Sequence, residues 1–188
     1  NLDNAIMAIA LAVESGIDPL SISMEMGRLV GPAGRLEKVD IGQKFLALVD
    51  YAHTPDAVKR ALSAVRAITS GRVIAVLGCG GNRDATKRPL MGAALQSCSD
   101  FAIFTSDNPR SESPEEILDQ MVSEITLNDS CVREVDRRGA IAIAVSEAQE
   151  GDTVILLGKG HETGQEIMGI KYPFDDRIEL ARAIEQLS

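Results

Sequence analysis

The sequence predicts an α/β fold in which helices cover both faces of a mostly parallel sheet. Two observations predict this class. Short apolar runs alternate with longer helical stretches over most of the chain, and each apolar run is continuous instead of alternating with polar residues. Continuous runs are typical of strands buried on both faces, and strand–helix alternation is typical of a doubly wound sheet. We therefore expect a Rossmann-like doubly wound sheet, preceded by a helical segment.

The opening stretch forms the helical segment. Good helix formers dominate Ala5–Ala12, and Gly16 and Pro19 divide the stretch into two helices. The best candidate for a linker is Gly31–Gly34, because its glycines and proline favour loops. The two helices have no partner layer of their own before this linker. The expected domains are residues 1–32, the tail of a preceding domain, and residues 33–188, the α/β domain.

Beyond the linker, each predicted strand is followed by a predicted helix. The predicted strands are Phe45–Val49, Arg72–Leu77, Phe101–Phe104, a shorter one near Val132–Val135, and Thr153–Leu157. The predicted helices are Pro55–Ile68, Pro89–Cys98, one that opens at Ser113, Arg137–Gln149, and one from Asp175. Ser113, Pro114 and Glu116 form the pattern of a capping box. We expect Gln165–Tyr172 to be an antiparallel edge strand.

The composition excludes several classes of protein. Of 188 residues, 45% are hydrophobic and 25% charged, which is ordinary for a globular chain. The net charge of −9 argues against a nucleic-acid surface. No apolar run approaches the roughly 18 residues of a membrane span, and Asn1–Asn4 is not the start of a basic signal peptide. The three cysteines form no CxxC pair and there are only two histidines, so we expect no zinc site and a cytoplasmic location. We also expect a monomer.

Four polar loops follow predicted strands, at the edge where a doubly wound sheet binds ligands. These loops are Asp50–Asp56, Gly78–Asp84, Thr105–Arg110 and Gly158–Glu162. They bring cationic side chains to one edge of a chain that is acidic overall, namely Arg83, Lys87, Arg88, Arg110 and Lys159. The sequence therefore predicts an anionic ligand, either a carboxylate or a phosphate.

Each loop also has a simpler interpretation. Gly78–Gly81 resembles the start of a dinucleotide fingerprint, but Arg83 stands in place of the closing glycine, which favours a tight strand-to-helix turn. His53 is either a ligand contact or a hydrogen-bond donor that staples its loop. Arg110 could pair with an acidic neighbour such as Glu112 on the surface. Cys79 has no neighbouring base in the sequence, so we exclude it as a nucleophile.

Taken together and in this order, the loops are similar to the C-terminal domain of the Mur ligases. The motifs that carry the resemblance are Asp50–Asp56, Gly78–Asp84 with Lys87–Gly92, Asp107–Arg110 and Gly158–Glu162. The resemblance covers nearly the whole chain. It implies that Asn1–Asn4 and the helix after it are the end of the family's central ATPase domain, and that Gly34–Glu37 is its hinge.

Within that family, Asp107-Asn108-Pro109-Arg110 implies meso-diaminopimelate as the incoming amino acid. This compound differs from lysine by a carboxylate beside its distal amine, which a guanidinium fork at Arg110 and an amide at Asn108 could bind. The resemblance implies that Arg83 also holds the carboxylates of the amino acid. It implies that the carbonyl of Gly158 and the carboxylate of Glu162 accept from an ammonium group.

The resemblance also implies a nucleotide side and a reaction. The residues implied to contact ATP are Asn4, Arg35, Asp50 and His53. ATP, with Mg²⁺, would activate the D-glutamyl carboxylate of UDP-MurNAc-L-Ala-D-Glu as an acyl phosphate, which the amine of diaminopimelate then attacks. In this step of peptidoglycan synthesis the C-terminal domain mainly places the amine.

Several parts of the family pattern are missing from these residues. They include the Gly-x-Gly-Lys-Thr phosphate loop, the magnesium ligands, the modified lysine and the uridine-binding domain, so we expect these 188 residues alone to be inactive. One alternative is a Mur-ligase-like structural subunit of a larger assembly, without ligase activity. Intact Arg83, Asn108, Arg110 and Glu162 disfavour that alternative. A free-standing dinucleotide-binding module is disfavoured by the missing closing glycine.

Overall fold

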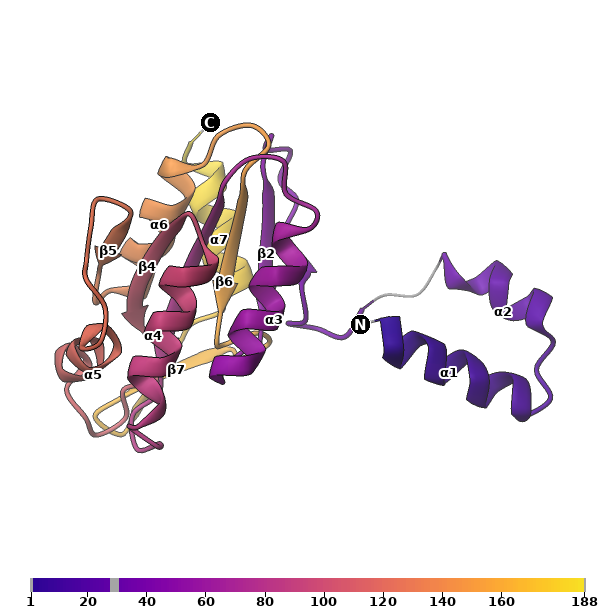
Figure 1. Cartoon of the computed structure of the whole chain (residues 1–188), viewed down its shortest axis with the longest axis horizontal. Helices are drawn as coiled ribbons and strands as arrows, with labels where there is room; N and C mark the ends of the chain where they lie inside the picture. The colour runs from indigo at the N-terminus through magenta and orange to yellow at the C-terminus, as the bar shows by residue number, and fades with distance from the viewer. Residues whose placement is uncertain (1, 28–30, 188) are drawn as a thin grey trace. The chain divides into compact units, whose positions relative to one another are not determined.

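The computed structural model describes residues 2–27 and 31–187. Asn1 of the predicted opening, residues 28–30 before the predicted linker, and residue 188 lie outside the described residues. The chain divides into two compact units, residues 1–31 and residues 32–188 (Figure 1). No helix within the described ranges combines the length and the apolar character needed to cross a membrane.

The first unit holds two helices, as predicted from Gly16 and Pro19. They are α1 (Leu2–Glu14) and α2 (Pro19–Met26). Gly16 adopts φ +87° just after α1, and the carboxylate of Asp18 caps α2 by accepting from the backbone N–H of Ser21 at 3.0 Å. Within the described part of this unit, large apolar side chains such as Met7 and Met24 remain 62% and 72% exposed.

The second unit is built on a six-stranded sheet with the order β1-β2-β6-β3-β4-β5. Only β1 is antiparallel to its neighbour, and the other strands run parallel. The strands are β1 (Glu37–Lys38), β2 (Leu46–Asp50), β3 (Val73–Cys79), β4 (Phe101–Ser106), β5 (Cys131–Arg133) and β6 (Thr153–Leu157). Because β2, β6, β3 and β4 are parallel, their carboxyl ends meet at one edge of the sheet.

Helices cover both faces of this sheet (Figure 1). The helices are α3 (Pro55–Arg66), α4 (Lys87–Cys98), α5 (Pro114–Val122), α6 (Arg137–Glu147) and α7 (Asp176–Glu185). In β3, Ala75 and Leu77 pack with α3, α4 and α5, whereas Ile74 and Val76 pack with α6 and α7. This double burial explains the continuous apolar runs and confirms the predicted doubly wound α/β fold.

The edge of the sheet differs from the prediction in one respect. Gln165–Tyr172 is not an edge strand of the main sheet but most of a separate hairpin, formed by β7 (Gly164–Ile167) and β8 (Ile170–Pro173). The turn residues Met168 and Gly169 both adopt positive φ, at +50° and +75°, which reverses the chain on itself. The antiparallel edge strand is instead the short β1, which pairs with β2. The hairpin contacts the loop after β4, where the backbone N–H of Arg110 donates to the carbonyl of Glu166.

Candidate functional site

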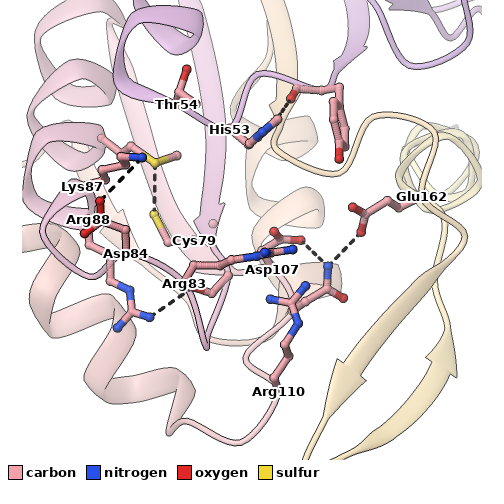
Figure 2. A pocket seen from close by; sticks show the side chains of 15 residues that line it. His53, Thr54, Cys79, Arg83, Asp84, Lys87, Arg88, Asp107, Arg110 and Glu162 are labelled. Carbon is pink, nitrogen blue, oxygen red and sulfur yellow. Dashed lines mark hydrogen bonds and ion pairs between the residues drawn. The ribbon is translucent and has the colours of Figure 1, made fainter.

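A pocket of about 430 Å³ opens at the carboxyl edge of the sheet (Figure 2). The loops that follow β2, β3, β4 and β6 form its walls. The predicted site residues that line it are His53, Arg83, Asp107, Asn108, Arg110 and Glu162. Pro109 and Gly158 are buried within the same loops. The structure therefore brings together side chains from four separated parts of the sequence.

The glycine-rich loop after β3 is a tight turn that lies against the loop after β4. A Cβ atom on Gly81 would collide with the carbonyl oxygen of Pro109. The backbone N–H of Gly81 donates to the carbonyl of Asn108 at 2.8 Å, and the carbonyl of Gly81 accepts from Arg110 Nη1 at 2.6 Å. The glycines thus allow the two loops to approach each other closely.

Arg83 and Arg110 flank Gly80 from these two loops. A Cβ atom on Gly80 would lie 3.1 Å from Arg110 Nη1 and 3.7 Å from Arg83 Cγ. Arg110 adopts φ +54°, and its backbone N–H donates to the carbonyl of Glu166 in the hairpin at 2.9 Å. Its Nε lies 3.6 Å from the Glu166 carboxylate. Arg83 is exposed, and its guanidinium has no partner within residues 2–27 and 31–187.

Asn108 links the carboxylates of Asp107 and Glu162, and these three side chains form the acidic wall of the pocket. Its Nδ2 donates to Glu162 Oε2 at 2.8 Å and to Asp107 Oδ1 at 3.3 Å (Figure 2). Its Oδ1 accepts from the backbone N–H of Glu166 at 3.0 Å and from Lys159 Nζ at 3.3 Å. Both amide hydrogens are therefore donated to carboxylates, so in this structure Asn108 orients Glu162 instead of offering a free donor.

Two of the cations that the sequence suggested for an anionic ligand are buried in ion pairs. Arg88 is 2% exposed and donates to both carboxylate oxygens of Glu112, at 2.7 and 2.9 Å. Those bonds, together with one from the backbone N–H of Asn82, lower the pKa of Glu112 to about 2. Lys159 is fully buried, and its Nζ lies 3.2 Å from Asp107. The prediction that Arg88 and Lys159 are available cations is therefore wrong.

The ion pairs in the structure show whether Arg110 pairs with an acidic neighbour, which the sequence left open. Arg110 does pair with an acidic side chain, but the partner is Glu166 at 3.6 Å and not Glu112, whose carboxylate is bound by Arg88. Of the exposed cations, Lys87 lies 3.6 Å from Asp84. The charged groups that face a ligand are the guanidinium groups of Arg83 and Arg110 on one side, that of Arg110 lying 3.6 Å from Glu166, and the carboxylate of Glu162, which is 36% exposed, on the other. The pocket thus offers both signs of charge.

A second group of predicted residues surrounds Tyr51, which the sequence prediction did not single out. Arg35 places its guanidinium 5.1 Å from the centre of the Tyr51 ring, and the ring of His53 lies 4.6 Å away. The Nδ1 of His53 is 2.8 Å from the carbonyl of Tyr51, a bond that staples the loop while the ring still lines the pocket. Tyr51 stands between Asp50 and His53 in the loop motif, and this position was the signal that could have found it.

The remaining predicted nucleotide contacts lie in different surroundings. Asp50 is buried, and its two carboxylate oxygens accept from the backbone N–H groups of Leu36 at 2.9 Å and Ala52 at 2.8 Å. Asn4 is exposed on α1, in the other unit of the chain. The structure therefore gathers Arg35, Asp50 and His53 around one loop and leaves Asn4 to be considered separately.

Neither nucleophilic chemistry nor metal binding is indicated by the described side chains. Burial raises the pKa of the Cys79 thiol to about 12, and its Sγ lies 3.6 Å from Met91 Sδ. A thiol in this state is not a nucleophile at neutral pH. Within the described ranges, no cluster of three or more His, Cys, Asp or Glu side chains is suited to a metal ion.

Comparison with known proteins gives a consistent result. Residues 34–160 match the family profile of the Mur ligase, glutamate ligase domain. The chain is 47% identical over 191 aligned positions to a UDP-N-acetylmuramoyl-L-alanyl-D-glutamate–2,6-diaminopimelate ligase of Streptomyces avermitilis, covering 99% of this chain and 38% of that protein. The ligase of the same name from Aquifex aeolicus is 49% identical over 173 positions, which cover 92% of this chain and 36% of the relative.

Solved structures agree with this fold. A structure of a UDP-N-acetylmuramoyl-L-alanyl-D-glutamate–2,6-diaminopimelate ligase superimposes with a TM-score of 0.80 at 40% identity, over 100% of this chain and 38% of that one. A folylpolyglutamate synthase of Mycobacterium tuberculosis superimposes with a TM-score of 0.56 at 21% identity, over 75% of this chain and 32% of that one, and shows the fold alone. The chain thus spans less than two fifths of the length of these relatives.

Proposed function

We propose, since the chain belongs to the Mur ligase family through its glutamate ligase domain, that residues 33–188 are the amino-acid-binding domain of a ligase that adds meso-diaminopimelate. The enzyme would be a UDP-N-acetylmuramoyl-tripeptide synthetase, which forms an ATP-dependent amide bond on UDP-MurNAc-L-Ala-D-Glu in peptidoglycan synthesis. The relatives at 47% and 49% identity, both named as 2,6-diaminopimelate ligases, support this choice within the family. The substrate is a cytoplasmic precursor, which fits three free cysteines.

One observation carries the proposal, namely that a single pocket offers both signs of charge. Arg83 and Arg110 flank Gly80, and Glu162 lies on the other side of Asn108. Diaminopimelate carries two carboxylates and two ammonium groups, so each end of the molecule bears both signs. A pocket with two guanidinium groups and a carboxylate suits such a ligand better than a nucleotide, which is purely anionic in its phosphates.

Selection against lysine would depend on Arg110. Its guanidinium is already oriented by Gly81 and Glu166 and retains N–H groups for a carboxylate. Lysine has no distal carboxylate and would leave these remaining N–H groups without an acceptor from the ligand. Sites built around a polar group can reject the analogue that lacks it by about 10⁴-fold. The ammonium groups would be accepted by Glu162 and by the carbonyl of Gly158.

The nucleotide contacts stay a separate part of the proposal. Each oxygen of Asp50 accepts one backbone N–H and has a further lone pair, so the carboxylate can still accept a ribose hydroxyl. Arg35 and His53 both lie against the Tyr51 ring and would contact ATP from there. We also propose that residues 1–32, with Asn4, are the tail of the ATPase domain. ATP, when bound, supplies the activated phosphate, and no magnesium ligand is proposed among these residues.

Calorimetry with the 188-residue chain tests the proposal. We expect weak but measurable binding of meso-diaminopimelate and binding of L-lysine at least about tenfold weaker, because lysine offers Arg110 no distal carboxylate. Equal affinity for the two compounds would overturn the proposed specificity.

A further inference from the structure

The buried ammonium of Lys159 lies directly behind the acidic wall of the pocket. Its side chain is 0% exposed, and its Nζ contacts Asp107 at 3.2 Å, the Oδ1 of Asn108 at 3.3 Å and the carboxylate of Glu162 at 3.6 Å. The ring centre of Phe174 lies 6.0 Å from the same atom. The ammonium therefore cannot reach a ligand, yet it contacts all three polar groups of that wall.

The two carboxylates beside Lys159 differ in their access to the pocket. The side chain of Asp107 is 13% exposed, whereas that of Glu162 is 36% exposed. Lys159 and Asp107 consequently form a mostly buried pair, and Glu162 is the carboxylate that a ligand meets. The nearby Arg137 adds no net charge, because it is itself paired with Asp176 at 2.6 Å, both fully buried. The wall as a whole carries one net negative charge.

We propose that the Lys159–Asp107 ion pair keeps the net charge of the acidic wall at one negative charge. This charge helps the pocket to select a ligand that has no net charge. The inference rests on the proposed function, since it concerns the choice between diaminopimelate and lysine. Diaminopimelate has no net charge at neutral pH, whereas lysine carries one positive charge. A wall with a second negative charge would attract lysine more strongly and would repel the additional carboxylate of diaminopimelate.

Three variants of the full chain separate the charge of the pair from its packing. Lys159→Met leaves two negative charges on the wall, Asp107→Asn leaves none, and the double variant restores one. The measured quantity is the ratio of the dissociation constants for L-lysine and meso-diaminopimelate, obtained by calorimetry. Lys44→Met is the matched control, because Lys44 is 80% exposed and pairs with Glu150 outside the pocket.

The proposal predicts opposite shifts in the two single variants. The ratio falls by about tenfold in Lys159→Met, the size expected for one extra charge near a partly hydrated ligand. It rises in Asp107→Asn, and it returns to within about threefold of the wild type in the double variant. Lys44→Met leaves it unchanged. If Lys159→Met fails to fold in a urea titration, the comparison of Asp107→Asn with the double variant still decides the question.

The outcomes against the proposal are distinct from those against the function. Single variants that lose stability but keep the wild-type ratio would show that the pair is only structural, and so would a double variant that retains the shift of either single variant. A wild-type chain that does not distinguish the two amino acids would instead overturn the proposed function, and this inference with it.

Discussion

The two edges of the parallel sheet carry the same types of charged residue but use them differently. At the amino edge, Arg72 donates to Asp152 through Nε and Nη2 at 3.2 and 3.0 Å, and Arg66 pairs with Asp100 at 2.6 Å. The carboxylates there also accept backbone N–H groups at the start of β3. Each of these carboxylates links neighbouring segments of the chain, so the charged residues at this edge have a structural role.

At the carboxyl edge some charge is left over. Arg88 and Lys159 are paired, yet Arg83 has no partner in the described part of the chain and Glu162 faces the pocket. Backbone strain also gathers there, since Asn82 and Arg110 both adopt φ +54° without being glycine. The difference teaches that the presence of charges does not identify a binding site. A binding site is identified by the charges that face a pocket after the buried internal ion pairs have been counted.

The largest expected effect tests whether the carboxyl edge also contains a purely structural cation. Arg137 is fully buried and donates to Asp176 at 2.6 and 2.8 Å and to the last carbonyls of β4 and β6, Ser106 and Leu157. Arg137→Met would leave Asp176 as a buried unpaired charge, which lowers the free energy of unfolding by about 3–5 kcal/mol. Urea denaturation measures this loss.

The matched control removes both members of the pair. In Arg137→Met with Asp176→Leu no charge is left uncompensated, so we expect most of the lost stability to return. A single variant as stable as the wild type would show that Arg137 is not a structural cation.

A smaller effect is expected at the amino edge. Burial favours a raised pKa for Asp152, but hydrogen bonds from the backbone N–H groups of Arg72 and Gln149 and from the Arg72 side chain outweigh it and hold the pKa below its usual value. Asp152→Asn places an N–H group against these donors and lowers the free energy of unfolding by about 1–3 kcal/mol at pH 7. Ligand affinity at the opposite edge should not change.

The pH dependence gives the sign of this contribution. Because the pKa of Asp152 is lower in the folded chain, its stabilisation is complete above the usual aspartate value of about 3.9 and is lost as the pH falls through the folded value. The stability difference between wild type and Asp152→Asn should therefore shrink on acidification below about pH 4. A difference that grows on acidification would contradict the assignment.

Much of the fold could be predicted from particular residues. The continuous run Arg72–Leu77 predicted a strand buried on both faces, and the structure buries β3 throughout. Gly16 and Pro19 predicted the break between α1 and α2. The polar loops could be assigned to one edge because parallel strands have their carboxyl ends together. Local pattern and sheet geometry were sufficient for each of these predictions.

The site was less predictable, because burial and pairing depend on residues far apart in the sequence. Lys159 and Arg88 are cations in polar loops, and nothing local reveals that Asp107 and Glu112 neutralise them. The hydrogen bond from the Asn108 amide to Glu162, 54 residues away in the sequence, could not be predicted either. The prediction of an edge strand at Gln165–Tyr172 is wrong because the pattern of these residues does not specify their partner strand.

The most direct test concerns the guanidinium of Arg110 in the pocket. The affinities of the wild type and Arg110→Ala for meso-diaminopimelate and L-lysine form a cycle that isolates the contact between Arg110 and the distal carboxylate. A charge-assisted bidentate contact is worth about 1.5–3 kcal/mol, so we expect Arg110→Ala to weaken diaminopimelate binding at least about tenfold and to leave lysine binding nearly unchanged. Arg110→Lys should recover only part of the loss, because an ammonium cannot form the fork. Unchanged diaminopimelate affinity, or equal losses for both amino acids, would contradict a pocket that selects its ligand through Arg110.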